Sequence, residues 1–296
     1  MQFRGAIIAL LVSAVLALAA QDPPPTAPPP TAPPPTVPPP TVPPPGVPTP
    51  PAVPQGPPIL ENTGNPIVVP FQCTEEDIRL GGLTCSDDDP CPVYLELSAM
   101  ESTGIRLFTG GNIHTATATL FSVILGSDDN GHTWREAHER LRASGYDRIQ
   151  FVGAENGWAS GLALSPLPQD PFFLRTVDGG KTWRHTPIFT ETRYGSIQQF
   201  HFEDKTSGAL IIDHSAGSGA DRYERYETLD GGDSWTIKET NVKPLTLKRA
   251  ANVPASEWRV RADANSRSFQ LEHRQGQRWT SVAAFAVNLG VCRPPQ

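Results

Sequence analysis

Beyond residue 20 the chain has no apolar run that approaches the roughly 20 residues needed to cross a bilayer. Basic residues are also few, because 24 Lys and Arg stand against 31 Asp and Glu, a formal net charge of −7. No run of Lys and Arg offers a basic stripe for nucleic acid, and no basic amphipathic segment points to a membrane surface. We therefore predict no nucleic-acid partner and no membrane insertion once an N-terminal signal has been removed.

Catalytic and metal-binding patterns are missing as well. The chain has no Gly-x-Ser-x-Gly and no His-Glu-x-x-His, and none of its seven histidines belongs to a cluster with cysteines. His114, His201 and His214 are scattered along the chain, which is typical of turn or core residues. We therefore predict no enzyme activity, no catalytic residue, no cofactor and no metal.

Only four cysteines are present: Cys73, Cys85, Cys91 and Cys292. An even number in an exported chain predicts disulfides, although four cysteines allow three pairings and the sequence does not choose among them. Three precede the first expected strand and one follows the last, so at least one bridge should join the two ends of the domain. We favour Cys91 with Cys292, because each directly abuts a terminal strand, which leaves Cys73 with Cys85.

Residues 1–20 have the pattern of a secretory signal peptide. Arg4 is followed by an apolar run, Gly5–Ala20, which ends in small residues. The alternative is an uncleaved N-terminal anchor. We expect a protein that is secreted, periplasmic or held at the cell surface.

Residues 21–58 form a proline repeat, PPPTA PPPTA PPPTV PPPTV PPPGV. Proline fixes φ and lacks an amide donor, so this segment cannot form a helix or join a sheet. Polyproline II geometry, at about 3.1 Å per residue, would make it a semi-rigid spacer on the order of 100 Å long. The regular spacing favours a stalk over the alternative, a ligand for a proline-binding groove.

Residues 59–296 have a globular composition and many short alternating segments bounded by Gly, Asp and Asn. Alternation over four to six residues predicts strands, here at Val93–Ser98, Gly104–Thr109, Leu120–Leu125, Ile149–Val152, Phe172–Thr176, Phe200–Phe202 and Ala209–Ile212. Only Trp134–Ser144 has a helical pattern, for which we expect one short helical turn.

Three segments of this domain share the pattern Ser/Thr-x-Asp-x-Gly-x-Thr/Ser-Trp, and their tryptophans are 49 and 52 residues apart. A fourth, decayed copy, Phe269–Trp279, matches the second in its first aromatic residue, its second glycine and its tryptophan, with Arg274 in place of the aspartate. The residues that define these copies are Ser127, Asp129, Gly131, Thr133 and Trp134; Thr176, Asp178, Gly180, Thr182 and Trp183; Thr228, Asp230, Gly232, Ser234 and Trp235; and Gly276 and Trp279.

The repeated pattern resembles the Asp-box, or bacterial neuraminidase repeat, which in its family is a hairpin turn between the outer strands of a propeller blade. Its residues suit that turn, because Asp can accept hydrogen bonds from turn amides, Gly can adopt positive φ and Trp can wedge between strands. We therefore predict an all-β, propeller-like domain of four blades, or five if Leu60–Pro90 contributes strands. A catalytic or Ca²⁺-binding role for the aspartates is the alternative, but the box recurs in propellers of unrelated function.

A second motif narrows the resemblance. Arg148–Gly161 contains an Ile-x-Phe strand and Gly-Trp-Ala, and it leads through Phe172–Thr176 into the second box. This order is similar to the photosystem II stability/assembly-factor family of propellers, whose members bind partner proteins. Two departures are evident: those factors have more blades, and their arginine-rich patch is not visible here, since Arg259 with Arg261 and Arg222 with Arg225 are only isolated pairs.

Sialidases also carry Asp-boxes, and they use a tyrosine nucleophile paired with a glutamate. Tyr223–Glu227 has these residue types, but it alternates as a plain strand, with Glu224 and Tyr226 on one face. We therefore predict a monomeric, non-enzymatic binding or assembly propeller that recognises a protein or glycan in the cell envelope or outside the cell. The alternatives are a glycan-active hydrolase of sialidase type and a purely structural surface protein.

Overall fold

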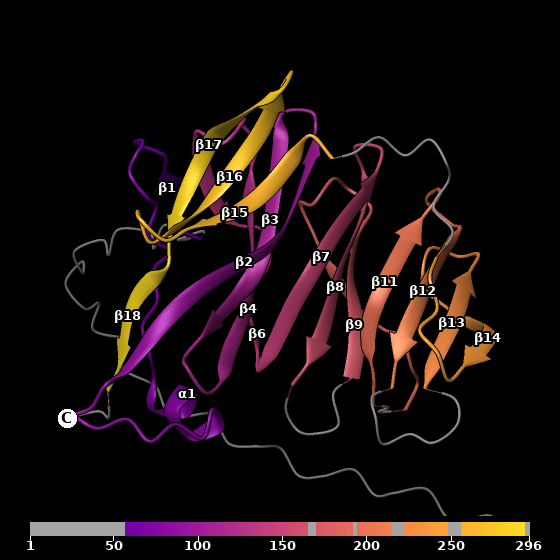
Figure 1. Cartoon of the computed structure of the whole chain (residues 1–296), viewed down its shortest axis with the longest axis horizontal. Helices are drawn as coiled ribbons and strands as arrows, with labels where there is room; N and C mark the ends of the chain where they lie inside the picture. The colour runs from indigo at the N-terminus through magenta and orange to yellow at the C-terminus, as the bar shows by residue number, and fades with distance from the viewer. Residues whose placement is uncertain (1–56, 165–169, 192–193, 215–221, 248–255, 294–296) are drawn as a thin grey trace, which may run out of the picture. The chain divides into compact units, whose positions relative to one another are not determined.

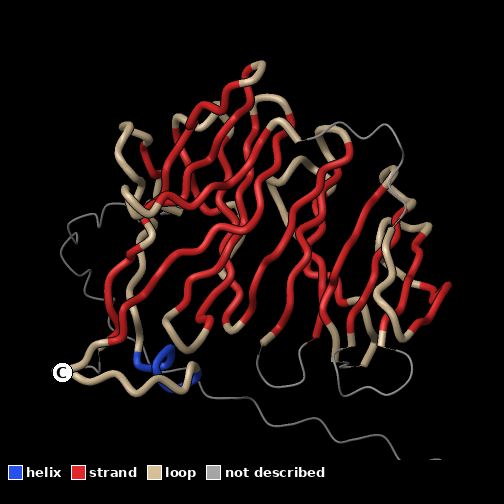
Figure 2. Tube along the Cα trace, in the orientation of Figure 1, coloured by secondary structure: helices blue, strands red, loops and turns tan. Residues whose placement is uncertain are grey.

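The computed structural model describes residues 57–164, 170–191, 194–214, 222–247 and 256–293. The predicted signal peptide and all but the last two residues of the predicted stalk lie outside the described residues. Strands dominate the described domain (Figure 2). The predicted all-β fold class is confirmed.

The described strands form four antiparallel sheets (Figure 1). Sheet 1 has the order β1-β5-β4-β3-β2-β18, with β6 paired to β4, and its strands are β1 (Leu60–Glu61), β2 (Cys91–Thr103), β3 (Arg106–His114), β4 (Thr119–Ser127), β5 (Thr133–Glu136), β6 (Leu141–Arg142) and β18 (Asn288–Cys292). Sheet 2 contains β7 (Ser144–Val152), β8 (Asn156–Ala163), β9 (Asp170–Thr176) and β10 (Arg184–Pro187). Sheet 3 contains β11 (Ser196–Phe202), β12 (Gly208–Asp213), β13 (Tyr223–Thr228) and β14 (Thr236–Asn241). Sheet 4 contains β15 (Trp258–Asp263), β16 (Ser268–Gln275) and β17 (Arg278–Ala286).

The helix of the described domain is not where the sequence pattern placed it. Trp134–Ser144 contains β5 and β6 instead of a helical turn, because its tryptophan is buried and the segment pairs with β4. The helix is α1 (Glu75–Leu80), which begins at a capping box in which Thr74 and Asp77 bond each other's backbone amides. Residues 60–90 therefore supply a two-residue strand and this helix, and the described residues form four sheets rather than five.

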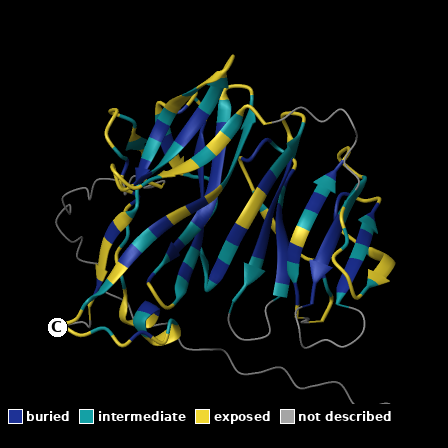
Figure 3. Cartoon of the chain, in the orientation of Figure 1, coloured by how far each residue is buried: buried dark blue, intermediate teal, exposed yellow. Residues whose placement is uncertain are grey.

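Apolar clusters join the sheets in the order 4, 1, 2, 3. Phe285 of sheet 4 packs against sheet 1, Phe108 of sheet 1 packs against sheet 2, and Phe173 of sheet 2 packs against sheet 3. Among the described residues, no hydrophobic cluster joins sheet 3 to sheet 4. Figure 3 shows the buried residues concentrated in the central strands, whereas β14 is largely exposed.

The two ends of the domain are linked, but not by the pairing that we favoured from the sequence. The disulfides are Cys73–Cys292 and Cys85–Cys91. β18 pairs with β2 so that Cys292 lies directly opposite Cys91, as expected if both abut terminal strands. The predicted pairing Cys91–Cys292 is nevertheless wrong. The buried Cys292 bonds to Cys73, which lies just before α1, and Cys91 closes a short loop with Cys85.

Candidate functional site

Each of the three complete boxes is a turn closed by its own side chains. In the first, the Ser127 hydroxyl donates to Asp129 over 2.8 Å and accepts from the Gly131 amide, also over 2.8 Å. The other Asp129 contacts come from the amide and hydroxyl of Thr133, at 2.9 and 2.6 Å. Gly131 has φ 88°, a value that favours glycine. The same contacts recur at Thr176, Asp178, Gly180 and Thr182 and at Thr228, Asp230, Gly232 and Ser234.

These contacts engage both carboxylate oxygens of each box aspartate. Burial works to raise the pKa of Asp129 and of Asp178, but hydrogen bonds from neighbouring hydroxyls and amides outweigh it and lower each pKa to about 2. At Asp230 the Ser234 hydroxyl is the largest cause, and the pKa is again lowered to about 2. A carboxylate that stays ionised and binds its own turn is poorly suited to general acid–base work. The contacts favour a structural role.

A side chain from outside the turn binds a backbone carbonyl of each complete box. Asn62 Nδ2 donates to the Gly131 carbonyl and to Val282 of sheet 4, at 2.9 and 2.8 Å. Arg106 of sheet 1 donates to the Gly179 carbonyl in the second box over 3.0 Å. Trp158 of sheet 2 donates to the Gly231 carbonyl in the third box over 2.9 Å.

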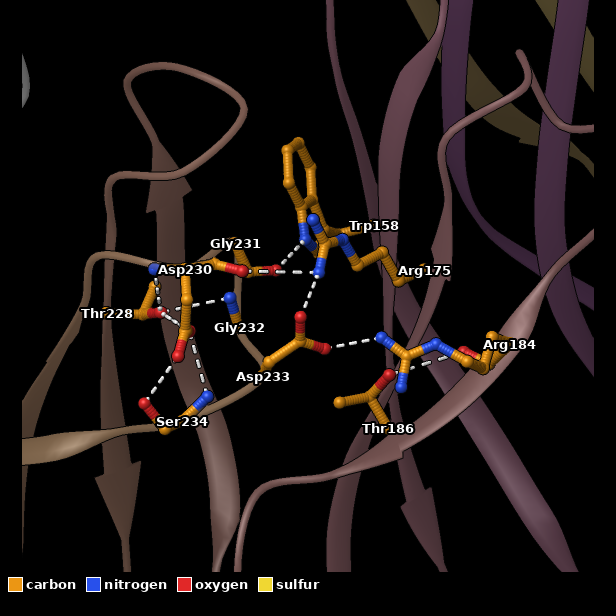
Figure 4. A network of polar contacts seen from close by, with 10 residues as sticks. All are labelled: Trp158, Arg175, Arg184, Thr186, Thr228, Asp230, Gly231, Gly232, Asp233 and Ser234. Carbon is orange, nitrogen blue, oxygen red and sulfur yellow. Dashed lines mark hydrogen bonds and ion pairs between the residues drawn. The ribbon is translucent and has the colours of Figure 1, made fainter.

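Figure 4 shows the contact between sheet 2 and the third box. Besides the Trp158 bond, Arg175 reaches the Asp230 carbonyl at 3.3 Å and the Asp233 carboxylate at 2.9 Å. Arg184 binds the other oxygen of Asp233. These polar contacts make the box part of the junction between two sheets.

The box tryptophans also pack across these junctions. Ring centroids lie 5.3 Å apart for Trp134 and Phe285 of sheet 4, 6.1 Å for Trp183 and Phe108 of sheet 1, and 5.8 Å for Trp235 and Phe173 of sheet 2. The fourth copy differs, because Trp279 lies beneath the guanidinium of Arg259, 4.1 Å from the ring centroid. Gly276 forms a tight β16–β17 turn with φ 63°, and a Cβ there would meet nothing within 4 Å.

Among the described residues, no further sheet covers the face of sheet 3 that corresponds to the covered faces of sheets 1 and 2, although the segment that ends at Leu247 lies on part of it. Strand register makes Phe108, Trp158 and Ala209 equivalent, because each pairs with the residue just before the first box position. On the strand that leads into each box, the third residue before the first box position is Ile124 in sheet 1, Phe173 in sheet 2 and Arg225 in sheet 3. Ile124 and Phe173 are buried in apolar clusters, whereas Arg225 is a charged residue. Arg225 and Glu227 therefore make part of this face polar in sheet 3, beside the buried Ile211.

A groove of about 580 Å³ lies on this face, lined by parts of all four strands and by Thr246 and Leu247 of the segment after β14. The Leu247 amide donates to Gln199 over 3.1 Å, which holds that segment against the sheet. A second groove, of about 450 Å³, lies at the junction of the first two boxes, beside Phe108. The sheet 3 groove is the larger, and we take it as the candidate site.

The sheet 3 groove has more negative than positive side chains. Arg225 is bonded to Glu227 at 2.5 Å and to Glu239 at 3.4 Å, and Glu203 lines the same groove. One guanidinium thus faces three carboxylates, while the neighbouring Leu229 is 84% exposed. An acidic wall beside an exposed aliphatic side chain suits a polypeptide segment that carries Lys or Arg.

The tyrosine–glutamate pair of the sialidase alternative lies on the opposite face of β13. The Tyr226 hydroxyl donates to Glu224, whose carboxylate is also 2.7 Å from His214 Nε2. All three residues are buried, and Tyr226 belongs to the cluster between sheets 2 and 3. None of them lines either groove. Of the scattered histidines, His201 lines the sheet 3 groove and His114 bonds the Thr115 carbonyl.

Sequence reasoning did not find the groove. The available signal was the change from Phe173 to Arg225 and from Arg175 to Glu227 when the second and third repeats are aligned on their boxes. Within the described part of the chain, no group of three or more His, Cys, Asp or Glu side chains could hold a metal ion. No helix among the described residues has the length and apolarity to cross a membrane.

Comparison with protein-family models and with curated proteins finds no match. Among solved structures, the chain is similar to "YCF48 bound to D1 peptide", with 18% identity, a TM-score of 0.38 and coverage of 65% of this chain. It is also similar to a polysaccharide lyase, the PL25 ulvan lyase, free and bound to -[GlcA(1-4)Rha3S]-, with 10% identity, a TM-score of 0.38 and coverage of 69%. The chain spans 56% and 54% of the lengths of these proteins.

Proposed function

We propose that this chain is an exported, non-enzymatic binding propeller whose sheet 3 groove recognises a basic segment of a partner protein in the cell envelope or outside the cell. One observation carries the proposal: sheet 3 has a polar, grooved face at the position where sheets 1 and 2 are covered by another sheet. The similarity of Arg148–Trp183 to the assembly-factor propellers, whose partners are proteins, supports the choice of a protein ligand.

The chemistry of the groove supports binding without catalysis. Arg225 is neutralised by Glu227 and Glu239, which leaves the groove with an excess of negative charge. Such a surface attracts Lys and Arg and discriminates against acidic segments. The box aspartates bind their own turns, and the pair Tyr226–Glu224 is buried away from the groove. These contacts favour the binding role over a hydrolase of sialidase type.

The experiment compares three forms of the mature protein as bait for proteins of an envelope fraction: wild type, the double variant Glu227→Lys/Glu239→Lys and the control Asp88→Lys. Asp88 is exposed and lies in the loop closed by Cys85 and Cys91. We expect wild type and control to retain the same protein in a salt-sensitive manner, and the double variant to lose it. Retention of the same protein by all three forms would refute a binding role of the groove. Hydrolysis of sialosides by wild type would refute the non-enzymatic role.

A further inference from the structure

Sheet 4 has a polar face that is directed away from sheet 1. Trp258, Val260, Phe269 and Leu271 pack with the apolar cluster shared with sheet 1. Because successive side chains of a strand point to opposite faces, the residues between them lie on the other side. Strand register places Arg259 beside Glu272, Arg261 beside Gln270 and Arg274 beside Trp279 on this second face.

Two arginines on this face share one buried carboxylate. Arg259 Nε donates to one oxygen of Glu272 over 2.6 Å, and Arg261 Nε donates to the other over 2.9 Å. The Glu272 side chain is only 7% exposed, whereas the arginine side chains are 42% and 45% exposed. Burial works to raise the pKa of Glu272, but the two arginines outweigh it and lower the pKa, so the carboxylate stays ionised.

The geometry leaves donors for a ligand. Both bonds to Glu272 use Nε, so the terminal nitrogens of each guanidinium remain for other acceptors; one of them, Nη2 of Arg261, lies 3.8 Å from Asp263. The Arg259 guanidinium also lies over the Trp279 ring, which helps to hold it in place. Arginines whose orientation is already fixed lose less freedom when they bind planar or tetrahedral oxyanions. Glu272 acts here as a positioning residue.

The surroundings of the arginine pair favour a saccharide ligand. Gln270 accepts from the Ser281 hydroxyl over 2.6 Å and donates to Ser268 over 2.9 Å, which fixes an amide and a hydroxyl beside Arg261. Together with the partly exposed indole of Trp279, these groups match the hydroxyls and the apolar faces of sugar rings.

We propose that the Arg259–Glu272–Arg261 unit binds the oxyanion groups, carboxylates or sulfate esters, of an acidic polysaccharide. The local charge agrees with an anionic ligand, because the register places Arg259, Arg261 and Arg274 on this face with the carboxylates of Glu272 and Asp263, while the nearby Glu257 carboxylate lies 3.8 Å from His273. This site is separate from the sheet 3 groove, and neither proposal depends on the other.

The test measures the affinity of the mature protein for polygalacturonate, dextran sulfate, neutral dextran and poly-glutamate by titration calorimetry. We expect wild type to bind at least one anionic polysaccharide and not neutral dextran, and the two anionic probes distinguish carboxylate from sulfate ester. Arg259→Ala/Arg261→Ala should weaken binding about tenfold or more, since it removes charge-assisted hydrogen bonds. The control Arg79→Ala removes an exposed arginine of α1 and should bind like wild type.

Two further variants separate recognition from folding. Arg259→Lys/Arg261→Lys keeps the charge but loses the planar fork, so it should bind more weakly than wild type at an unchanged melting temperature. Glu272→Gln should weaken binding because the arginines are no longer held. Three results would each overturn the proposal. They are an equal loss of binding in Arg79→Ala, full binding by the double alanine variant, and tighter binding of poly-glutamate than of either anionic polysaccharide.

Discussion

The disulfide Cys73–Cys292 should be a major contributor to the stability of the domain. It joins residues 219 apart, whereas Cys85–Cys91 joins residues 6 apart. On the chain-entropy model, closing the longer loop is worth about 5 kcal/mol and closing the shorter one about 2 kcal/mol. Cys292→Ser should therefore lower the free energy of unfolding by about 3 kcal/mol more than Cys91→Ser.

Urea unfolding under oxidising conditions measures both variants, and peptide mapping without reduction identifies the bridges. Cys292→Ser should leave Cys73 as a free thiol, and Cys91→Ser should leave Cys85 free. In wild type, where Cys91 lies directly opposite Cys292 in the ladder of β2 and β18, a Cys91–Cys292 bridge is the competing pairing. A wild-type Cys91–Cys292 peptide, or equal destabilisation by the two variants, would refute the reasoning.

Three more predictions concern the junctions between sheets. Trp134→Ala should lower the free energy of unfolding in urea by about 3–5 kcal/mol, because this ring is buried against Phe285. Trp279→Ala should lower it by about 1 kcal/mol or less, because its ring is only partly buried. Equal costs of the two variants would contradict the packing. Asn62→Ala should cost about 1–3 kcal/mol by the same measurement, because the Val282 carbonyl loses this donor and the Gly131 carbonyl is left with the Trp134 indole, and an unchanged midpoint would count against that link. The box aspartates have pKa values of about 2, against an ordinary 3.8, so their ionised form stabilises the folded state. This contribution to the free energy of unfolding is present above pH 3.8 and is lost as the pH falls toward 2. The urea midpoint of wild type should fall over that range, and it should fall less when all three aspartates are replaced by asparagine.

The fold could be predicted because each box carries its own geometric requirements. Asp129 binds its own turn and Gly131 has positive φ, so three copies of the same pattern specify three similar hairpins without knowledge of the rest of the chain. Helix α1 had a comparable local signal in its capping box, Thr74 with Asp77, but the prediction favoured the segment Trp134–Ser144. There, burial of the tryptophan and pairing with β4 overrode helix propensity.

The candidate sites could not be predicted, because they depend on which faces the packing leaves uncovered. Arg225 and Glu239 are 14 residues apart, and they meet through the register of β13 and β14. Arg259 and Glu272 likewise meet only through the pairing of β15 with β16. The sequence shows these residues as isolated charges in strands, and only the arrangement of the sheets shows which charges share an exposed face.

The fourth repeat indicates what maintains a box in this chain. Each complete box receives a donor from outside its turn: Asn62, Arg106 or Trp158. Sheet 4 has no such neighbour among the described residues, and there the turn has lost its aspartate and become a tight hairpin at Gly276. The box is thus retained where the turn is part of a junction between sheets. Recognition chemistry is therefore best sought at residues that depart from the repeat, such as Arg225 in place of Phe173, because these residues are released from packing against a neighbouring sheet.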